Sequence, residues 1–294
     1  MEKLKNIFSQ RLKNARIMRN MSMENLAKAC NNIVSKQSIS KYENAIMLPD
    51  STVCIALAKA LDISIEDLFR PIKFNIEGVE FRKKMSLGKK KIEAIKKIVE
   101  NRIESYIEIE DILNILPSRP HKQYQVNKAE DVYSIANKIK QEWKLGQNAI
   151  SNVITQLEEH NIKVIEIDVE SNFDGLTALA DNQYYIIVLN KRFPEERKRF
   201  TALHELGHII MKFQDDISDK QKEYMCNLFA SEMLISKEKF IQIIGQNRQN
   251  ISINELREIQ KRFGISIDAL MYKAKHESVI SENKYRNFCI YFLK

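Results

Sequence analysis

A chain of 294 residues with 44% hydrophobic and 29% charged side chains has the composition of a globular protein and is long enough for about two domains. No apolar run approaches the roughly 20 residues that cross a bilayer, and no apolar signal-peptide core follows residues 1–5, so we expect no membrane partner. The four cysteines form no C-x-x-C pair, which predicts reduced thiols in a cytoplasmic protein.

The positive charge is concentrated in the first half of the chain. Residues 1–70 carry 11 basic and 7 acidic side chains, residues 71–128 carry 13 and 8, and residues 129–294 carry 23 and 24. This distribution is expected where only the front of a protein meets a polyanion. Solvated helical faces explain the same excess equally well, so charge alone does not establish nucleic-acid binding.

Residues 6–70 are predicted to form five short helices. Ser35 has the residue type and position of an N-cap for the third of them, at 36–43. Within that helix Ile39 and Tyr42 are three residues apart, so both face the core.

The run Lys36-Gln37-Ser38-Ile39-Ser40-Lys41-Tyr42-Glu43-Asn44 resembles the recognition helix of the Xre/phage-repressor family of helix-turn-helix domains, and residues 61–69 resemble the end of that domain. The resemblance implies that residues 1–70 bind double-stranded DNA and place this helix in a major groove. Gln37 would then pair with adenine, and the two lysines would reach guanine or phosphates. The DNA-binding candidates are Lys36, Gln37, Ser38, Lys41 and Asn44.

Two positions depart from that family. Met23 stands where a Gln is usual near the start of the second helix, which implies the loss of a phosphate or base contact. Ala45 stands where a Gly usually follows the recognition helix, and we expect the left-handed turn to move onto Asn44, because Asn tolerates a positive φ better than Ala does. A five-helix module that contacts only protein is the alternative for this segment.

Residues 71–128 are predicted to connect the module to a second domain. The passage 72–81 has partial strand-like alternation, and residues 89–116 have apolar positions three or four apart, as in a long amphipathic helix. We interpret that helix as a spacer or as the contact of a homodimer, in preference to a further DNA-binding element. Residues 117–121 contain two prolines and are predicted to form a hinge.

Residues 129–294 are predicted to form an α+β domain with a helical tail, so the whole chain is mainly α with a small β-sheet. Two helices are expected first, and a period of two then indicates strands. The helices are expected at 129–143 and 147–159, and the strands around 162–167, 176–180 and 184–190.

The motif His204-Glu205-Leu206-Gly207-His208 follows these strands. In a helix the two histidines lie one turn apart on the same face, where two imidazoles bind one Zn²⁺ at about 2.0–2.1 Å each. Glu205 stands beside them, where a carboxylate takes a proton from water. An ordinary helix with two histidines is the alternative. A catalytic zinc needs a third protein ligand, and the acidic candidates downstream are Asp215, Asp216, Asp219, Glu223 and Glu232.

Further residues around this motif resemble the ImmA/IrrE group of zinc-dependent metallopeptidases. They are Arg199-Phe200-Thr201, Phe173-Asp174-Gly175 and the later run at 223–234. The resemblance covers roughly residues 130–275 and implies a zincin-like domain. It departs at Leu234-Ile235-Ser236, where many members have Leu-Met-Pro, and this affects a turn.

The resemblance implies that His204, His208 and Glu223 bind one Zn²⁺ and that Glu205 is the general base. Asn227, one helical turn after Glu223 on the same face, would be a hydrogen-bond partner of a metal ligand and would not itself bind the metal. The strand at 184–190 is the candidate edge strand for receiving a substrate backbone, with a plain buried strand as an equal alternative. For the oxyanion the candidates are Tyr184, Tyr185 and His276.

The implied function is a zinc-dependent endopeptidase fused to a DNA-binding domain. Members of this kind cut or inactivate a transcriptional repressor and so switch on stress, phage or mobile-element genes. One alternative is a helix-turn-helix regulator whose zinc domain is a sensor or scaffold without proteolysis. The other is an interaction module of the toxin–antitoxin type.

Overall fold

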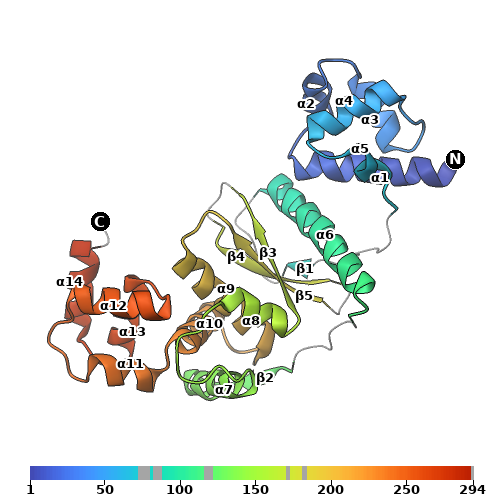
Figure 1. Cartoon of the computed structure of the whole chain (residues 1–294). Helices are drawn as coiled ribbons and strands as arrows, with labels where there is room; N and C mark the ends of the chain where they lie inside the picture. The colour runs from blue at the N-terminus through green and yellow to red at the C-terminus, as the bar shows by residue number, and fades with distance from the viewer. Residues whose placement is uncertain (72–79, 82–87, 116–121, 170–172, 181–183, 293–294) are drawn as a thin grey trace. The chain divides into compact units, whose positions relative to one another are not determined.

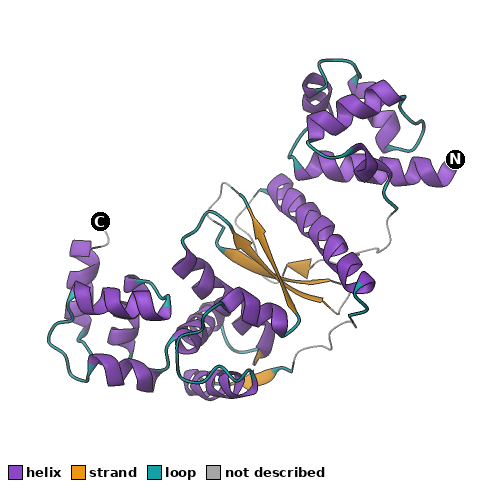
Figure 2. Ribbon diagram, in the orientation of Figure 1, coloured by secondary structure: helices purple, strands orange, loops and turns teal. Residues whose placement is uncertain are grey.

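The computed structural model describes residues 1–71, 80–81, 88–115, 122–169, 173–180 and 184–292. The chain forms two compact units, drawn in Figures 1 and 2. The first contains helices α1 to α6, and the second contains the later helices together with the described strands. Among the described helices, none combines the length and the apolar character that crossing a membrane requires.

Helices α1 to α5 pack around one hydrophobic core, as the sequence predicts. Their bounds are Glu2–Met18, Met23–Ala29, Lys36–Glu43, Ser51–Leu61 and Ile65–Phe69. Each helix from α2 to α5 begins at a side chain that accepts a hydrogen bond from the backbone N–H three residues later, which stabilises its free amino end. These caps are Ser22, Ser35, Asp50 and Ser64. The completely buried core side chains include Phe8, Leu12, Leu26, Ile39, Leu57, Leu61 and Leu68.

A buried ion pair fixes α3 against α1. The guanidinium of Arg16 donates hydrogen bonds of 2.6 and 2.7 Å to the two carboxylate oxygens of Glu43, which is only 6% exposed. The hydrogen bond to Glu43 raises the pKa of Arg16 above its ordinary value. The inner face of α3 is thus held by both apolar packing and charge, and its outer face is left to solvent.

Helix α6 (Lys89–Ile112) belongs to the first unit and packs on α1. The guanidinium of Arg11 donates two hydrogen bonds of 2.6 Å to Glu104 and a third, of 3.1 Å, to the backbone oxygen of Arg70. The predicted connector helix therefore forms, and it is tied to the five-helix module by its own side chains.

Some predictions for this part of the chain fall on positions that the structure does not describe. They concern residue 116 at the end of the long helix, the hinge at 117–121 and residues 72–79 of the extended passage. The last two residues of that passage form strand β1 (Glu80–Phe81).

The main sheet of the second unit has the strand order β1-β4-β5-β3. Its other strands are β3 (Ile162–Ile167), β4 (Gly175–Ala180) and β5 (Tyr184–Asn190). Strand β5 pairs with β3 in parallel and with β4 antiparallel, and all seven of its residues are buried. The prediction that 184–190 is an edge strand is therefore wrong. A substrate strand cannot be added to β5, because both of its hydrogen-bonding edges are occupied.

The described part of the second unit also contains eight helices. They are α7 (Ala129–Glu142), α8 (Val153–Glu159), α9 (Glu195–Ile210), α10 (Asp219–Leu234), α11 (Lys237–Ile244), α12 (Ile253–Phe263), α13 (Ile267–His276) and α14 (Glu282–Phe292). Helix α8 packs on β3, α9 packs on β4 and β5, and α10 packs on α9. Strand β6 (Met211–Phe213) directly follows α9 and pairs in parallel with β2 (Tyr124–Val126), which precedes α7. The helix predicted at 147–159 begins only at Val153, because Asn152 caps it by accepting a hydrogen bond from the backbone N–H of Thr155.

Candidate metal centre

Helices α9 and α10 lie against each other and carry the residues of the motif. Gly207 permits this close contact. A Cβ atom at Gly207 would lie 3.4 Å from the Cα and the sulfur of Cys226 on α10 and 3.1 Å from Met211. The glycine of the motif therefore lets α10 approach the two histidines.

Three side chains from these helices meet at one point. Nε2 of His204 lies 3.1 Å from Nε2 of His208, and the carboxylate oxygens of Glu223 lie 3.3 Å and 3.4 Å from these two nitrogens. Ligands at about 2.0–2.1 Å from a tetrahedral zinc are separated by about 3.3–3.4 Å from one another, so these spacings suit one such ion. Within the described part of the chain, this is the group of three potential ligands whose donor atoms lie within 4.8 Å of one another.

The protonation of His204 supports the same interpretation. Its Nδ1 lies 2.8 Å from Oδ1 of Asn227, an amide oxygen that can only accept, so Nδ1 carries the proton. In the neutral imidazole, Nε2 of His204 then carries a lone pair that faces the carboxylate of Glu223. Two electron-pair donors at this distance repel each other unless a cation lies between them. The donor set therefore fits a bound metal ion.

Glu205 lies on the sheet side of α9. It is 2% exposed, and its Oε2 accepts a hydrogen bond of 2.8 Å from the hydroxyl of Thr177 on β4. Gly175, two residues before Thr177, makes room for the helix, because a Cβ atom there would lie 2.5 Å from Cγ2 of Thr201 on α9. Thr177 was missed in the sequence, since no spacing rule links a strand residue to the motif. The nearby Gly175 was part of a recognised run, but its role was not apparent.

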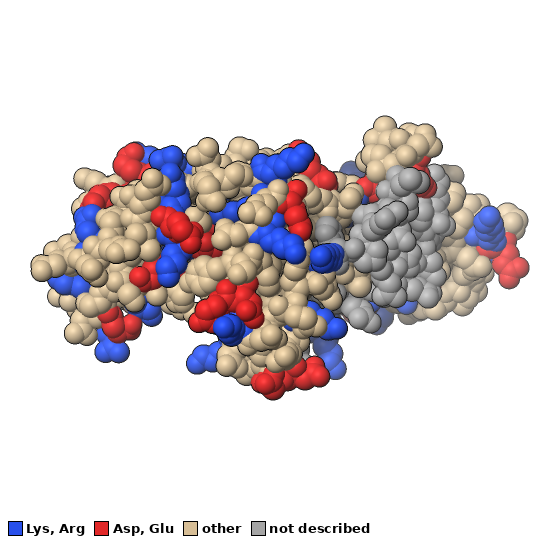
Figure 3. Space-filling view, turned by 90° about the horizontal axis from the view of Figure 1, so that it is seen from below, with Lys and Arg blue, Asp and Glu red and all other residues tan. Residues whose placement is uncertain are grey.

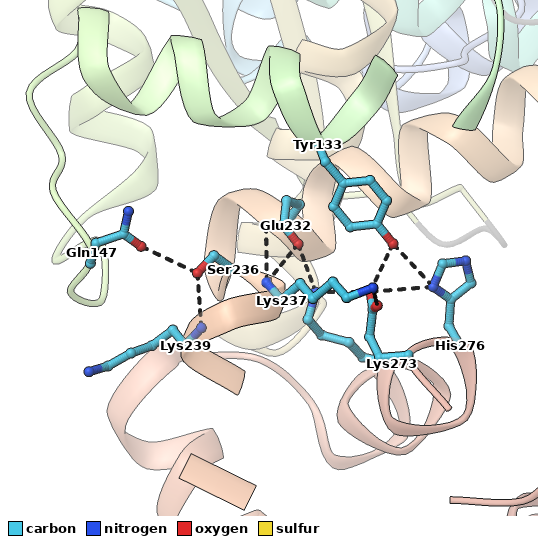
Figure 4. A network of polar contacts seen from close by, with 9 residues as sticks. Tyr133, Gln147, Glu232, Ser236, Lys237, Lys239, Lys273 and His276 are labelled. Atoms are coloured by element: carbon cyan, nitrogen blue, oxygen red, sulfur yellow. Dashed lines mark hydrogen bonds and ion pairs between the residues drawn. The ribbon is translucent and has the colours of Figure 1, made fainter. Parts of the chain in front are cut away.

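The other acidic candidates lie elsewhere. Asp215, Asp216 and Asp219 are exposed in the segment between β6 and α10 and at the start of α10. Glu232 is completely buried and accepts hydrogen bonds of 3.0 Å from Lys273 and from the backbone N–H of Lys237, as Figure 4 shows. Only Glu223, of the five candidates, joins the two histidines in the described group.

The three oxyanion candidates have different surroundings. Tyr184 and Tyr185 are buried residues of the central strand β5. His276 forms a short hydrogen bond with the hydroxyl of Tyr224, and its other ring nitrogen lies 3.4 Å from the hydroxyl of Tyr133. These contacts place His276 in a polar network that joins α7, α10 and α13.

The predicted DNA-binding residues lie on the outer face of α3. Lys36, Gln37 and Lys41 are exposed. The hydroxyl of Ser38 lies 3.0 Å from that of the capping residue Ser35, and the side-chain amide of Asn44 donates a 2.7 Å hydrogen bond to the backbone oxygen of Ser40.

The expected position of the left-handed turn after α3 is wrong. Asn44 has a φ of −102°, and Ala45 has a φ of 57°. The hydrogen bond from the amide of Asn44 to Ser40 keeps Asn44 at the end of the helix, so the reversal falls on the next residue.

Comparisons with known proteins match both units. A peptidase family model described as the IrrE N-terminal-like domain matches residues 157–275, and a model described as helix-turn-helix matches residues 12–68. The radiation response metalloprotease IrrE of Deinococcus deserti is 27% identical over 104 residues, which cover 31% of this chain and 36% of that relative. IrrE of Deinococcus radiodurans is 26% identical over 112 residues, or 34% of each protein. The chain thus spans about a third of the length of these curated relatives.

Proposed function

Because this chain carries an IrrE N-terminal-like peptidase domain behind a helix-turn-helix domain, we propose that it is a zinc-dependent endopeptidase that also binds double-stranded DNA. Its proposed substrate is a transcriptional repressor, whose cleavage would switch on stress, phage or mobile-element genes. The observation that carries the proposal is the group of His204, His208 and Glu223 with a buried carboxylate, Glu205, on the adjoining face of the same helix.

The side chains of the site have different roles in the proposed hydrolysis. A zinc ion supplies electrophilic polarisation of a peptide carbonyl and makes water more acidic. His204, His208 and Glu223 would hold the ion, and Asn227 keeps the first of them in the tautomer that can bind a metal. Glu205 would take the proton of the attacking water and return it to the leaving amine.

Thr177 orients the general base in this proposal. Its hydroxyl donates to one carboxylate oxygen of Glu205, which leaves the other oxygen to accept a proton. Three protein ligands leave one position open for substrate, whereas structural zinc sites usually have four protein ligands. The ligand set therefore favours hydrolysis over a purely structural role for the metal.

The deciding test is co-expression with a candidate transcriptional repressor, together with metal analysis of the purified chain. We expect about one zinc per chain in the wild type and in Glu205→Gln, and cleavage of the repressor only by the wild type. Glu258→Gln, at an exposed glutamate of α12, is the matched control and should cleave as the wild type does. Equal cleavage by Glu205→Gln would remove Glu205 as the base. Cleavage by neither protein would favour the regulator with a zinc scaffold.

DNA binding by α3 is tested separately. Gln37→Ala combined with Lys41→Ala should abolish a sequence-selective gel shift without changing the zinc content, because both side chains lie exposed on the outer face of α3. Lys261→Ala, an exposed lysine of the second unit, serves as the control. Operator binding that survives the double substitution would show that α3 is not the recognition helix.

A homodimer formed through α6 is also part of the proposal. The inner positions of its apolar stripe are buried, but Ile109, Ile112 and Leu113 at its carboxyl end are 57%, 71% and 61% exposed. Light scattering of the wild type and of Ile109→Lys/Ile112→Lys tests this contact. A dimer that dissociates in the variant supports it, and an equal mass for both proteins contradicts it.

A further inference from the structure

We propose that a cavity next to the metal centre receives one uncharged, apolar side chain of the substrate polypeptide. The cavity has a volume of about 270 Å³ and lies between α9, α10 and α13 of the second unit. This inference rests on the proposed peptidase function and adds the class of residue that the site would select.

The register of α9 and α10 places the cavity one helical turn from the metal ligands. His208 contacts Glu223 and His204 contacts Asn227, so the two helices run antiparallel. The next positions along the same faces are Phe200 and Ser231, which both line the cavity.

The distance suits a residue beside the cleaved bond. One helical turn is about 5.4 Å, and residues of an extended chain are about 3.3 Å apart with side chains standing away from the backbone. A peptide whose scissile carbonyl lies at the open metal position can therefore place a neighbouring side chain in the cavity. Asn227 connects the metal centre with the cavity, because it is hydrogen-bonded to the ligand His204 and also lines the cavity.

The cavity wall is largely aromatic and aliphatic. Phe200, Tyr224, Leu228, Ala269 and Tyr272 supply this lining. Small-molecule sites commonly have volumes of about 300–1,000 Å³, so a cavity of about 270 Å³ is small and suits a single large side chain. Leucine, methionine and phenylalanine have the required size and polarity.

The charged groups at the cavity are already paired. Nζ of Lys273 lies 3.0 Å from Glu232 and 4.0 Å from Glu277, and all three side chains are almost completely buried. His276 is hydrogen-bonded to Tyr224 on the same wall. Figure 4 shows Lys273 beside Glu232 and His276 beside Tyr133. A charged occupant would lose its hydration without gaining a free counter-ion, so the cavity favours a neutral group.

A first experiment measures binding to the zinc-loaded full chain in the Glu205→Gln background, with ligand-observed NMR. We expect N-acetyl-phenylalaninamide to bind at least tenfold more tightly than N-acetyl-glycinamide, because only the former has a side chain for the cavity. Ala269→Phe should remove this difference by filling the cavity, and Ala269→Ser, which leaves it open, should keep it. Ala269→Leu provides a smaller filling substitution if Ala269→Phe does not fold.

A second experiment uses cleavage of a random peptide library by otherwise wild-type chains that carry these substitutions at Ala269. We expect large apolar residues to be enriched at one position beside the cleaved bond, and Ala269→Phe to shift that enrichment toward Gly and Ala with unchanged zinc content. No enrichment, or the same enrichment in Ala269→Phe, would overturn the inference.

The two experiments separate the possible failures. Cleavage without side-chain preference would contradict the role of the cavity and leave the peptidase function standing. Binding of N-acetyl-phenylalaninamide without cleavage of any peptide would contradict the peptidase function itself. Binding of indole as tight as that of the capped phenylalanine, with no preferred position in the library, would identify the cavity as a site for a free small molecule and overturn the substrate assignment.

Discussion

Ala45, directly after α3, has a backbone conformation that costs an L-amino acid about 1–2 kcal/mol. Ala45→Gly should remove most of this cost and stabilise the first unit by about 0.5–1 kcal/mol, after allowance for the greater freedom of Gly in the unfolded chain. Hydrogen exchange of the α3 amides in the full chain measures the change. Asn44→Gly is the matched control and should destabilise, because Asn44 has a negative φ and a side-chain bond to Ser40.

Asn227 provides a second test at the scale of one residue. Asn227→Ala removes the oxygen that accepts the proton of His204 Nδ1, so we expect zinc affinity to fall by about 10- to 100-fold. Competition with a chelator of known affinity measures the effect. Ser231→Ala, one turn further along α10, should leave the affinity unchanged. Equal affinities for the wild type and Asn227→Ala would exclude this supporting role.

The two histidines and Glu205 could be placed from the sequence, because their spacing follows from the geometry of one helix. Glu223 lies on another helix and was distinguished from four other acidic candidates only by the resemblance to the ImmA/IrrE group. The position of Thr177 could not be predicted, because it depends on which strand packs against α9. The position of Glu205 likewise follows from the motif, but the hydrogen bond from Thr177 that orients it depends on tertiary packing.

At the scale of elements, removing one partner of the buried ion pair between α1 and α3 should cost much more stability than breaking an exposed pair. Arg16→Met leaves the carboxylate of Glu43 buried and unpaired, so we expect a loss of about 3–5 kcal/mol in the stability of the first unit. Lys28→Met breaks an exposed pair with Glu24 in α2 of the same unit and should cost less than about 1 kcal/mol. Chemical denaturation of both variants checks the difference, and similar losses would contradict it.

Element type was more predictable than element position. The three strands expected at 162–167, 176–180 and 184–190 could be predicted from alternation or from an apolar run, since these patterns are local. The order β1-β4-β5-β3 is set by pairing between distant segments, so the sequence did not reveal that β5 is central. The late start of α8 likewise depends on the cap at Asn152, which displaced the start expected at residue 147.

At the scale of the whole molecule, charge is spread over the surface and also concentrated in the interior of the second unit. On the face drawn in Figure 3, basic and acidic side chains are interspersed. Inside the second unit, Glu277 accepts hydrogen bonds of 2.8 Å from Lys237 and Tyr133. Burial alone would raise the pKa of Glu277, but hydrogen bonds from His276, Lys237 and Tyr133 and the charge of Lys273 outweigh it and bring the pKa to about 2.

This shift predicts a specific acid sensitivity. The pKa of Glu277 is lower in the folded state than its ordinary value of 4.5, so its contribution to stability is present above pH 4.5 and is lost as the pH falls toward 2. We expect Glu277→Gln to lose less stability over this interval than the wild type, by at most about 3 kcal/mol. Unfolding curves between pH 5 and pH 2 measure the difference, with Glu258→Gln as the exposed control. Parallel pH profiles for wild type and Glu277→Gln would contradict the assignment.

The buried charges have a practical consequence for dividing the protein into fragments. The family match ends at residue 275, so a fragment cut there would lack Glu277 and leave Lys237 and Lys273 without one of their counter-ions. A fragment that starts at residue 157 would also lack α7, which contributes Tyr133 to the same network. A stable fragment of the second unit therefore has to extend beyond the matched segment at both ends, because its boundaries are set by the charge network and not by sequence similarity.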